Sequence, residues 1–155
     1  MMVLDPARVV PSPWRNGGGA TRELAVSTAP CGNILWRISV ADLDRDAAFS
    51  VFPGMDRLFT ALGTLRLIVD GSPVDMLAGC QMRFTGETPV SVSLPAPTRA
   101  LNVMTRRGFC HAEVALRRAH PASGESAPEG SAVATVDLDE VLADVRLFLL
   151  PKDPR

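Results

Sequence analysis

The sequence predicts an all-β protein, built as a sandwich or barrel of short strands. Its apolar residues come in short runs that are interrupted by 13 prolines and 12 glycines. Before residue 137, no long segment repeats apolar residues at helical spacing. Frequent interruption combined with two-residue alternation is typical of sandwiches and barrels, because proline and glycine end strands and form turns.

The clearest predicted strand is ILWRISVADL, residues 34–43, whose even-numbered residues from Ile34 to Val40 share one apolar face. Arg37 and Ser39 lie on the other face, because successive strand side chains point to opposite sides. Residues 65–77 predict a hairpin: leucine and valine alternate, DGSP forms the turn, and the chain returns.

Three further runs alternate in the same way. VSVSL at 90–94 is one, and HAEVALRR at 111–118 is another. In ALNVMTRR, residues 100–107, leucine and valine lie on one face, and Asn102 and Arg106 lie on the other. Residues 1–118 therefore predict one barrel-like unit.

The C-terminal part has a different character. Residues 119–131 contain no large apolar side chain and predict a flexible loop or linker. Residues 132–155 follow as a segment that packs on the barrel or completes a reduced second half. Apolar residues from Leu138 to Val145 have helical spacing behind a capping Asp137, whereas those from Val145 to Leu149 alternate. We expect a short helical turn that leads into a last strand.

Composition narrows the class of protein. The net charge of −1 and the lack of a basic stripe argue against a nucleic-acid-binding protein. No apolar run is long enough to span a membrane, and the N-terminus does not resemble a secretory signal. Three widely spaced cysteines are typical of reduced thiols, so we expect a cytoplasmic protein.

A triple glycine stands in PWRNGGGATREL, residues 13–24. A phosphate-binding loop needs a following lysine, and a dinucleotide fingerprint needs a glycine where Arg22 stands, so neither fits. The stretch instead predicts a turn with positive φ, anchored by Trp14, which delivers Asn16 before it and Thr21 and Glu23 after it. The alternative is a surface loop whose charges are solvated.

A second stretch, FSVFPGMDRLFTAL at 49–62, places Asp56 next to Arg57. Strand neighbours point to opposite faces, so one of the two charges is expected to face inward. An inward charge needs a partner or a ligand, and Arg37 and Ser39 are candidates for its neighbours.

Metal ligands are scarce in this sequence. It has two histidines, of which His111 stands alone beside Cys110 and His120 lies in the predicted loop. Borderline metals prefer clustered imidazoles, so we expect a metal-free pocket and no cofactor.

These stretches, taken in order, resemble the HutD/Ves family. The matching blocks are PWRNGGGATREL, WRISVADL, FSVFPGMDR, RFTGETPV and LNVMTRRG. The resemblance implies a double-stranded β-helix, the RmlC-like jelly roll of the cupins, with a smaller second half that is reduced in this chain. It also implies a polar set around the barrel: Asn16, Thr21, Glu23, Arg37, Ser39, Asp56, Arg57, Asn102 and Arg106.

We therefore expect a small carboxylate-bearing metabolite as ligand, because arginine forks suit planar carboxylates. The resemblance implies a regulatory or sensing role in histidine utilisation or stress response. One alternative is a metal-independent isomerase or hydrolase with Glu23 as base and an arginine that stabilises the oxyanion. No activated nucleophile is evident, so an enzyme is the less favoured alternative. The other alternative is a non-catalytic assembly protein, and a homodimer is expected by analogy of fold.

Overall fold

The computed structural model describes residues 2–119 and 133–151. These residues form strands and one short 3-10 turn, η1 (Pro6–Arg8), and contain no α-helix, so the all-β prediction is confirmed. Of the flexible loop predicted at 119–131, residues 120–131 fall outside the described part. Within the described part, no helix is long and apolar enough to cross a membrane.

The strands form three sheets. The six-stranded sheet has the order β2 (Ser12–Pro13), β3 (Gly19–Thr28), β4 (Ile34–Leu43), β11 (Thr98–Arg106), β6 (Met55–Ala61), β9 (Gln81–Thr85). The barrel sheet has the order β5 (Ala47–Ala48), β10 (Val90–Ser93), β7 (Leu65–Val69), β8 (Ser72–Met76). The outer sheet has the order β1 (Met2–Leu4), β13 (Ala134–Asp137), β14 (Val141–Leu149), β12 (Cys110–Arg118).

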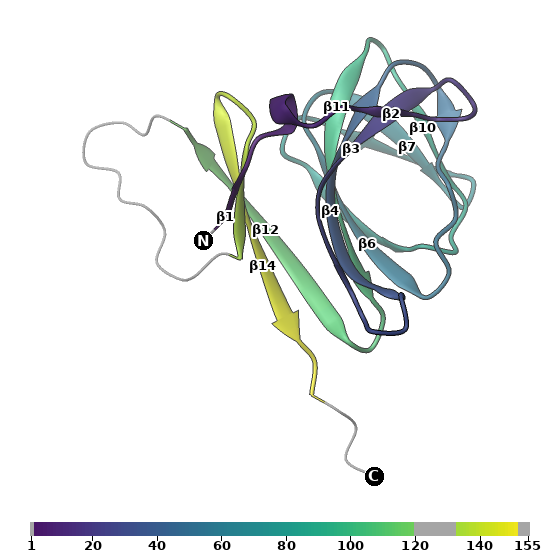
Figure 1. Ribbon diagram of the computed structural model, residues 1–155. Helices are drawn as coiled ribbons and strands as arrows, with labels where there is room; N and C mark the ends of the chain where they lie inside the picture. Colours follow the sequence, from purple (N-terminus) through teal and green to yellow (C-terminus); the bar gives the residue numbers. More distant parts are fainter. Residues whose placement is uncertain (1, 120–132, 152–155) are drawn as a thin grey trace.

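The six-stranded sheet is the shared middle layer. One of its faces packs on the barrel sheet through a core that includes Leu43 and Phe59. The other face packs on the outer sheet through a second core that includes Val40 and Leu101. In Figure 1 the outer sheet lies alongside the barrel, at the left of the view. Complete burial of each such side chain stabilises the fold by about 1.5–3 kcal/mol.

The predicted strands agree with the observed ones. Residues 34–43 form β4 as predicted, with Ile38 and Val40 in the outer core and Arg37 on the barrel side. Residues 65–77 form the β7–β8 hairpin, whose turn residues Asp70 and Gly71 both have positive φ (49° and 82°). This turn type matches the twist of paired strands.

The C-terminal segment differs from its prediction. No helical turn forms after Asp137; β13 and β14 are instead a hairpin joined at Leu138–Glu140. Asp137 accepts a hydrogen bond from the Asp139 amide (3.0 Å), and Asp139 has φ +73°, so the aspartate closes a strand turn. The helical spacing was misleading because it combines the turn residue Leu138 with residues on both faces of one strand, β14. The division into a barrel (1–118) and a C-terminal segment (132–155) stays a prediction.

Candidate functional site

A pocket of about 440 Å³ opens between the six-stranded sheet and the segment 48–52. Strands β4, β11 and β6 supply its floor in two rows. Arg37, Met104 and Arg57 face one another in one row, because Met104 pairs with both arginines. Asn102 pairs with Ser39 in the next row, one alternation further along the strands. Strand register thus brings together polar residues that lie far apart in the sequence.

Arg57 occupies the buried end of this pocket and is 8% exposed. Its guanidinium carbon lies 5.2 Å from the ring centre of Phe49, 5.6 Å from Phe52 and 5.1 Å from Phe84. Cations are attracted to aromatic faces at this range. The guanidinium also donates to the Ser50 carbonyl (3.5 Å) and to Asn102 Oδ1 (3.2 Å).

The charge of Arg57 meets no counter-ion in the part of the chain that the structure describes. Among the described residues, no carboxylate lies within ion-pair distance of it, and its Nε has no hydrogen-bond acceptor. Burial, followed by the nearby charge of Arg37, lowers the pKa of Arg57 to about 10. At neutral pH the group is therefore still charged. A charge that is buried and incompletely hydrogen-bonded is a cost to the fold that a nearby negative group would reduce.

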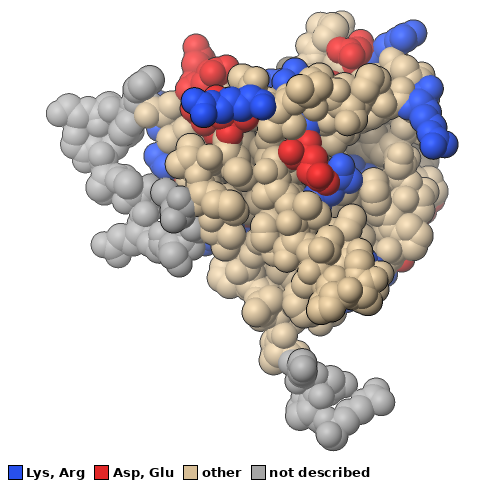
Figure 2. All heavy atoms as spheres, viewed as in Figure 1, with Lys and Arg blue, Asp and Glu red and all other residues tan. Residues whose placement is uncertain are grey.

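Arg37 lies at the more open side of the pocket, paired with Glu23. Its Nε is 2.9 Å from Glu23 Oε1, without hydrogen-bond geometry, so this Nε has no acceptor in the described part either. The Glu23 side chain is 49% exposed, whereas that of Arg37 is 20% exposed. Glu23 does not line the pocket. The ion pair therefore leaves Arg37 as the lining residue, with the Glu23 carboxylate half-exposed. Figure 2 shows acidic and basic side chains side by side on the surface.

The triple-glycine turn forms the rim of the pocket. Trp14 Nε1 donates to the Thr21 hydroxyl (2.8 Å), and the Trp14 ring packs edge-on against Phe49 at 5.9 Å. Asn16 accepts from the Gly18 amide (2.9 Å) and donates to the Ala48 carbonyl (3.1 Å). Asn16 thus ties the turn to the segment 48–52.

Close approach accounts for the glycines at the end of this turn. A Cβ on Gly18 would collide with that of Ala47, and a Cβ on Gly19 would collide with the Asp42 carbonyl oxygen. Gly17 has φ +73°, where side chains other than glycine are strained. The turn can lie this close to β4 and β5 only without side chains.

Six of the nine predicted site residues line the pocket: Asn16, Thr21, Arg37, Ser39, Arg57 and Asn102. The other three do not. Glu23 stands outside it as described above, Asp56 pairs with Arg107 on the opposite face of β6 (2.9 Å), and Arg106 donates to the Ile34 carbonyl (3.0 Å). Whether the six bind a ligand stays a prediction.

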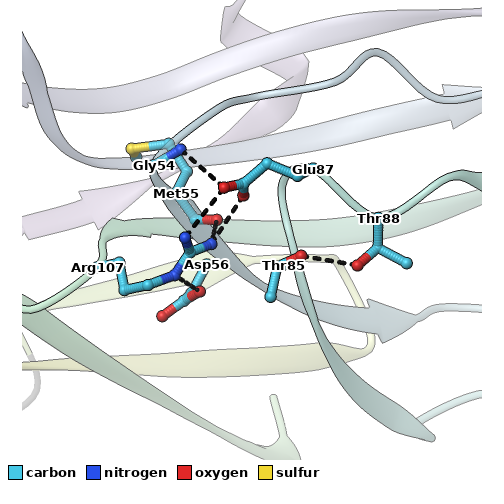
Figure 3. A network of polar contacts seen from close by, with 7 residues as sticks. All are labelled: Gly54, Met55, Asp56, Thr85, Glu87, Thr88 and Arg107. Atoms are coloured by element: carbon cyan, nitrogen blue, oxygen red, sulfur yellow. Dashed lines mark hydrogen bonds and ion pairs between the residues drawn. The ribbon is translucent and has the colours of Figure 1, made fainter.

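Sequence reasoning missed the aromatic wall and a surface cluster centred on Arg107. The signal for the wall was the Phe49–Phe52 spacing next to Arg57. For Arg107 the signal was the RR pair at 106–107, in which Arg106 ends β11 and Arg107 begins the following turn. Figure 3 shows the Arg107 guanidinium between Asp56 on one side and Glu87 on the other.

A metal site finds no support in the arrangement of side chains. Among residues 2–119 and 133–151, no group of three or more His, Cys, Asp or Glu side chains could hold an ion.

The fold and pocket define a cupin-type barrel with an arginine-rich cavity. The HutD family model matches residues 7–145, so the chain belongs to the HutD family. Protein Ves of Cronobacter sakazakii (strain ATCC BAA-894) is 35% identical over 126 residues, covering 74% of this chain and 65% of the relative. The "Uncharacterized 21.2 kDa protein in hutC 3'region" of Pseudomonas putida is 40% identical over 89 residues, covering 53% and 45%.

Solved structures agree with this family and fold. HutD from Pseudomonas fluorescens SBW25 has a TM-score of 0.68 and 29% identity, covering 74% of this chain and 65% of that chain. An RmlC-like cupin from Shewanella frigidimarina NCIMB 400 has a TM-score of 0.51 at 11% identity, covering 66% and 87%, which shows the fold alone. The chain thus spans less than two thirds of the length of its HutD and Ves relatives.

Gly19→Ala tests whether the glycine turn needs the close approach of Gly19 to β4. We expect this variant to lower the free energy of unfolding by about 1–3 kcal/mol, because the methyl group overpacks the contact with β4. It should also change the near-ultraviolet circular dichroism of Trp14, whose ring would lie 3.5 Å from the added methyl carbon and whose amide donates to the Gly19 carbonyl. Val10→Ala is the control, since Val10 is 86% exposed and lies outside the strands. An unchanged tryptophan signal in Gly19→Ala would contradict the account.

The Arg107 cluster predicts a pH effect. Hydrogen bonding from Arg107, assisted by the Gly54 amide, lowers the pKa of Glu87 from 4.5 to about 2. A depressed folded-state pKa contributes stability that is complete above the unfolded pKa and is lost as pH falls through the folded one. The difference in unfolding free energy between wild type and Glu87→Gln should therefore shrink from pH 4.5 to pH 2. Urea unfolding across this range measures it, and a constant difference would refute the assignment.

Proposed function

We propose that this HutD-family chain binds a small carboxylate-bearing metabolite in the Arg57 pocket and acts as a sensor or regulator. The observation that carries the proposal is the buried charge of Arg57, which meets no carboxylate among the described residues. Leaving such a charge uncompensated costs several kcal/mol. A bound anion would supply the missing partner.

The polar groups of the pocket are mostly donors, which favours an acceptor-only ligand group. Arg57 keeps an Nε–H without an acceptor among the described residues, whereas the Arg37 Nε lies 2.9 Å from Glu23 Oε1. Asn102 already uses its Oδ1 as an acceptor, which leaves its amide hydrogens for a ligand. The Thr21 hydroxyl accepts from Trp14 and can donate its own hydrogen. A carboxylate offers two oxygens in one plane and suits guanidinium forks.

The remaining surface of the pocket favours an organic ligand. Trp14, Phe49, Phe52 and Met104 supply apolar walls. A volume of about 440 Å³ lies within the range of small-molecule sites, roughly 300–1,000 Å³. The ligand we propose therefore has an apolar or planar body attached to its carboxylate.

A regulatory role in histidine utilisation rests on relatives. The P. putida relative is described by its place in the hutC 3′ region, and the P. fluorescens structure is of a HutD protein. Catalysis with Glu23 as base has weaker support, because its carboxylate is half-exposed and outside the pocket lining. The homodimer and the assembly role stay predictions.

A carboxylate titration tests the proposal. Formate is the first probe, since the P. fluorescens structure bears the words "Formate condition", and acetate and larger carboxylates follow. Binding should stabilise the wild type by RT ln(1 + [L]/Kd), about 2.7 kcal/mol at a hundredfold excess over Kd. Arg57→Met should lose this stabilisation while it melts no lower than the wild type without ligand, because a buried charge has been replaced by an apolar side chain.

The matched control is Arg66→Met, the same substitution at an arginine whose side chain is 55% exposed on β7. This variant should respond to carboxylates like the wild type. Acetamide, the neutral analogue of acetate, should not stabilise any of the three proteins. Equal stabilisation by acetate and acetamide, or an undiminished response in Arg57→Met, would refute the proposed function.

A further inference from the structure

The wall of the pocket opposite the sheet has no regular structure of its own. It is the connection between β5 and β6, which carries Phe49, Ser50 and Phe52. These residues supply two of the three rings around Arg57 and one of its hydrogen-bond acceptors. The geometry of the Arg57 site therefore depends on whatever fixes this connection.

The connection ends in a turn at residues 52–55, here called the Phe52 turn. Backbone contacts join the Phe52 turn to the β9–β10 turn, residues 86–89. The Phe52 amide donates to the Gly86 carbonyl (2.8 Å), and the Gly86 amide donates to the Met55 carbonyl (2.7 Å). A Cβ on Gly86 would collide with the Phe52 carbonyl oxygen. The two turns are thus in direct contact, and the hydroxyls of Thr85 and Thr88, 2.7 Å apart, close the second turn.

Arg107, from the turn after β11, clamps these two turns together. Its guanidinium donates to both oxygens of Glu87 (2.7 and 3.0 Å), to the Met55 carbonyl (3.0 Å) and to Asp56 (2.9 Å). The Arg107 amide donates to the Gly54 carbonyl (3.0 Å), and Glu87 accepts weakly from the Gly54 amide (3.4 Å). Figure 3 shows the side-chain contacts converging on one guanidinium.

The clamp lies on the other side of β6 from the pocket. Asp56 and Arg57 are strand neighbours, so the Asp56–Arg107 contact and the Arg57 cage occupy opposite faces. The Arg107 and Glu87 side chains are 44% and 45% exposed, where charges are screened by solvent. The clamp would therefore influence the pocket by fixing the position of the Phe52 turn, and not through the charges of Arg107 and Glu87.

We propose that Arg107 is a positioning residue: its grip on Glu87 fixes the Phe52 turn against the β9–β10 turn and so holds the aromatic wall on the Arg57 guanidinium. The consequence for affinity rests on the proposed function, since a displaced wall would loosen the site that receives the anion. The consequence for the surroundings of Arg57 exists without any ligand.

The test compares Glu87→Gln with wild type in two measurements. The first is the Nε–Hε resonance of Arg57 in ¹⁵N-labelled, ligand-free protein, which the three nearby rings displace through their ring currents. We expect this resonance to move. The second is the formate dissociation constant, which we expect to rise about three- to thirtyfold, as is usual for residues that act on a site through their neighbours.

Two further variants make the result specific. Arg107→Lys keeps the charge but cannot grip both Glu87 oxygens, so it should behave like Glu87→Gln. Asp75→Asn breaks the exposed Arg66–Asp75 pair (2.6 Å) on the β7–β8 hairpin and should change neither measurement. An Arg57 resonance that stays in place in folded Glu87→Gln would overturn the proposal. A moved resonance in a protein that does not bind formate would support the clamp and refute the proposed function.

Discussion

The buried guanidinium of Arg57 is the constraint on which the site depends. Removing a charge from water costs several kcal/mol, and that cost has to be offset locally. Three phenylalanine faces and two oxygen acceptors offset part of it, but the remaining N–H and the net charge are left without a protein partner in the described residues. Under the proposed function, donors that are already in place raise the affinity for an anion, because little has to be reordered on binding.

The fold provides the rigid support for that charge. Strands β4, β11 and β6 are used on both faces: one carries the core shared with the outer sheet, and the other carries the pocket row that contains Arg37 and Arg57. The irregular segments then close the pocket, and hydrogen bonds hold each of them to a neighbouring strand or turn. The glycine turn is pinned through Asn16, and the aromatic wall is pinned through contacts with the β9–β10 turn. The strands thus position Arg37 and Arg57, and the connection between β5 and β6 positions Phe49 and Phe52.

The sequence was sufficient to predict the strands and the turn that depend on local residue patterns. Alternation predicted β4 and β11 with the correct faces, and the glycine run predicted a turn that delivers polar residues to a pocket rim. Helical spacing was misleading from Leu138 to Val145, because it combines one turn residue with both faces of β14. The sequence did not distinguish the roles of Arg106 and Arg107, because the residue types do not mark where β11 ends and the turn begins. The three rings around Arg57 could not be predicted, because they come from strand β9 and from the connection before β6. Which residues of distant strands lie opposite one another is set by tertiary structure.

The central claim is that Arg57 draws an anion into this pocket. Crystals soaked in sodium bromide test it most directly, because bromide can be located by its anomalous scattering. The account predicts a bromide peak within hydrogen-bonding distance of the Arg57 guanidinium, and the loss of that peak when sodium formate is added to the soak. Ordered water beside Arg57 with no bromide, or a bromide peak that formate leaves unchanged, would contradict it.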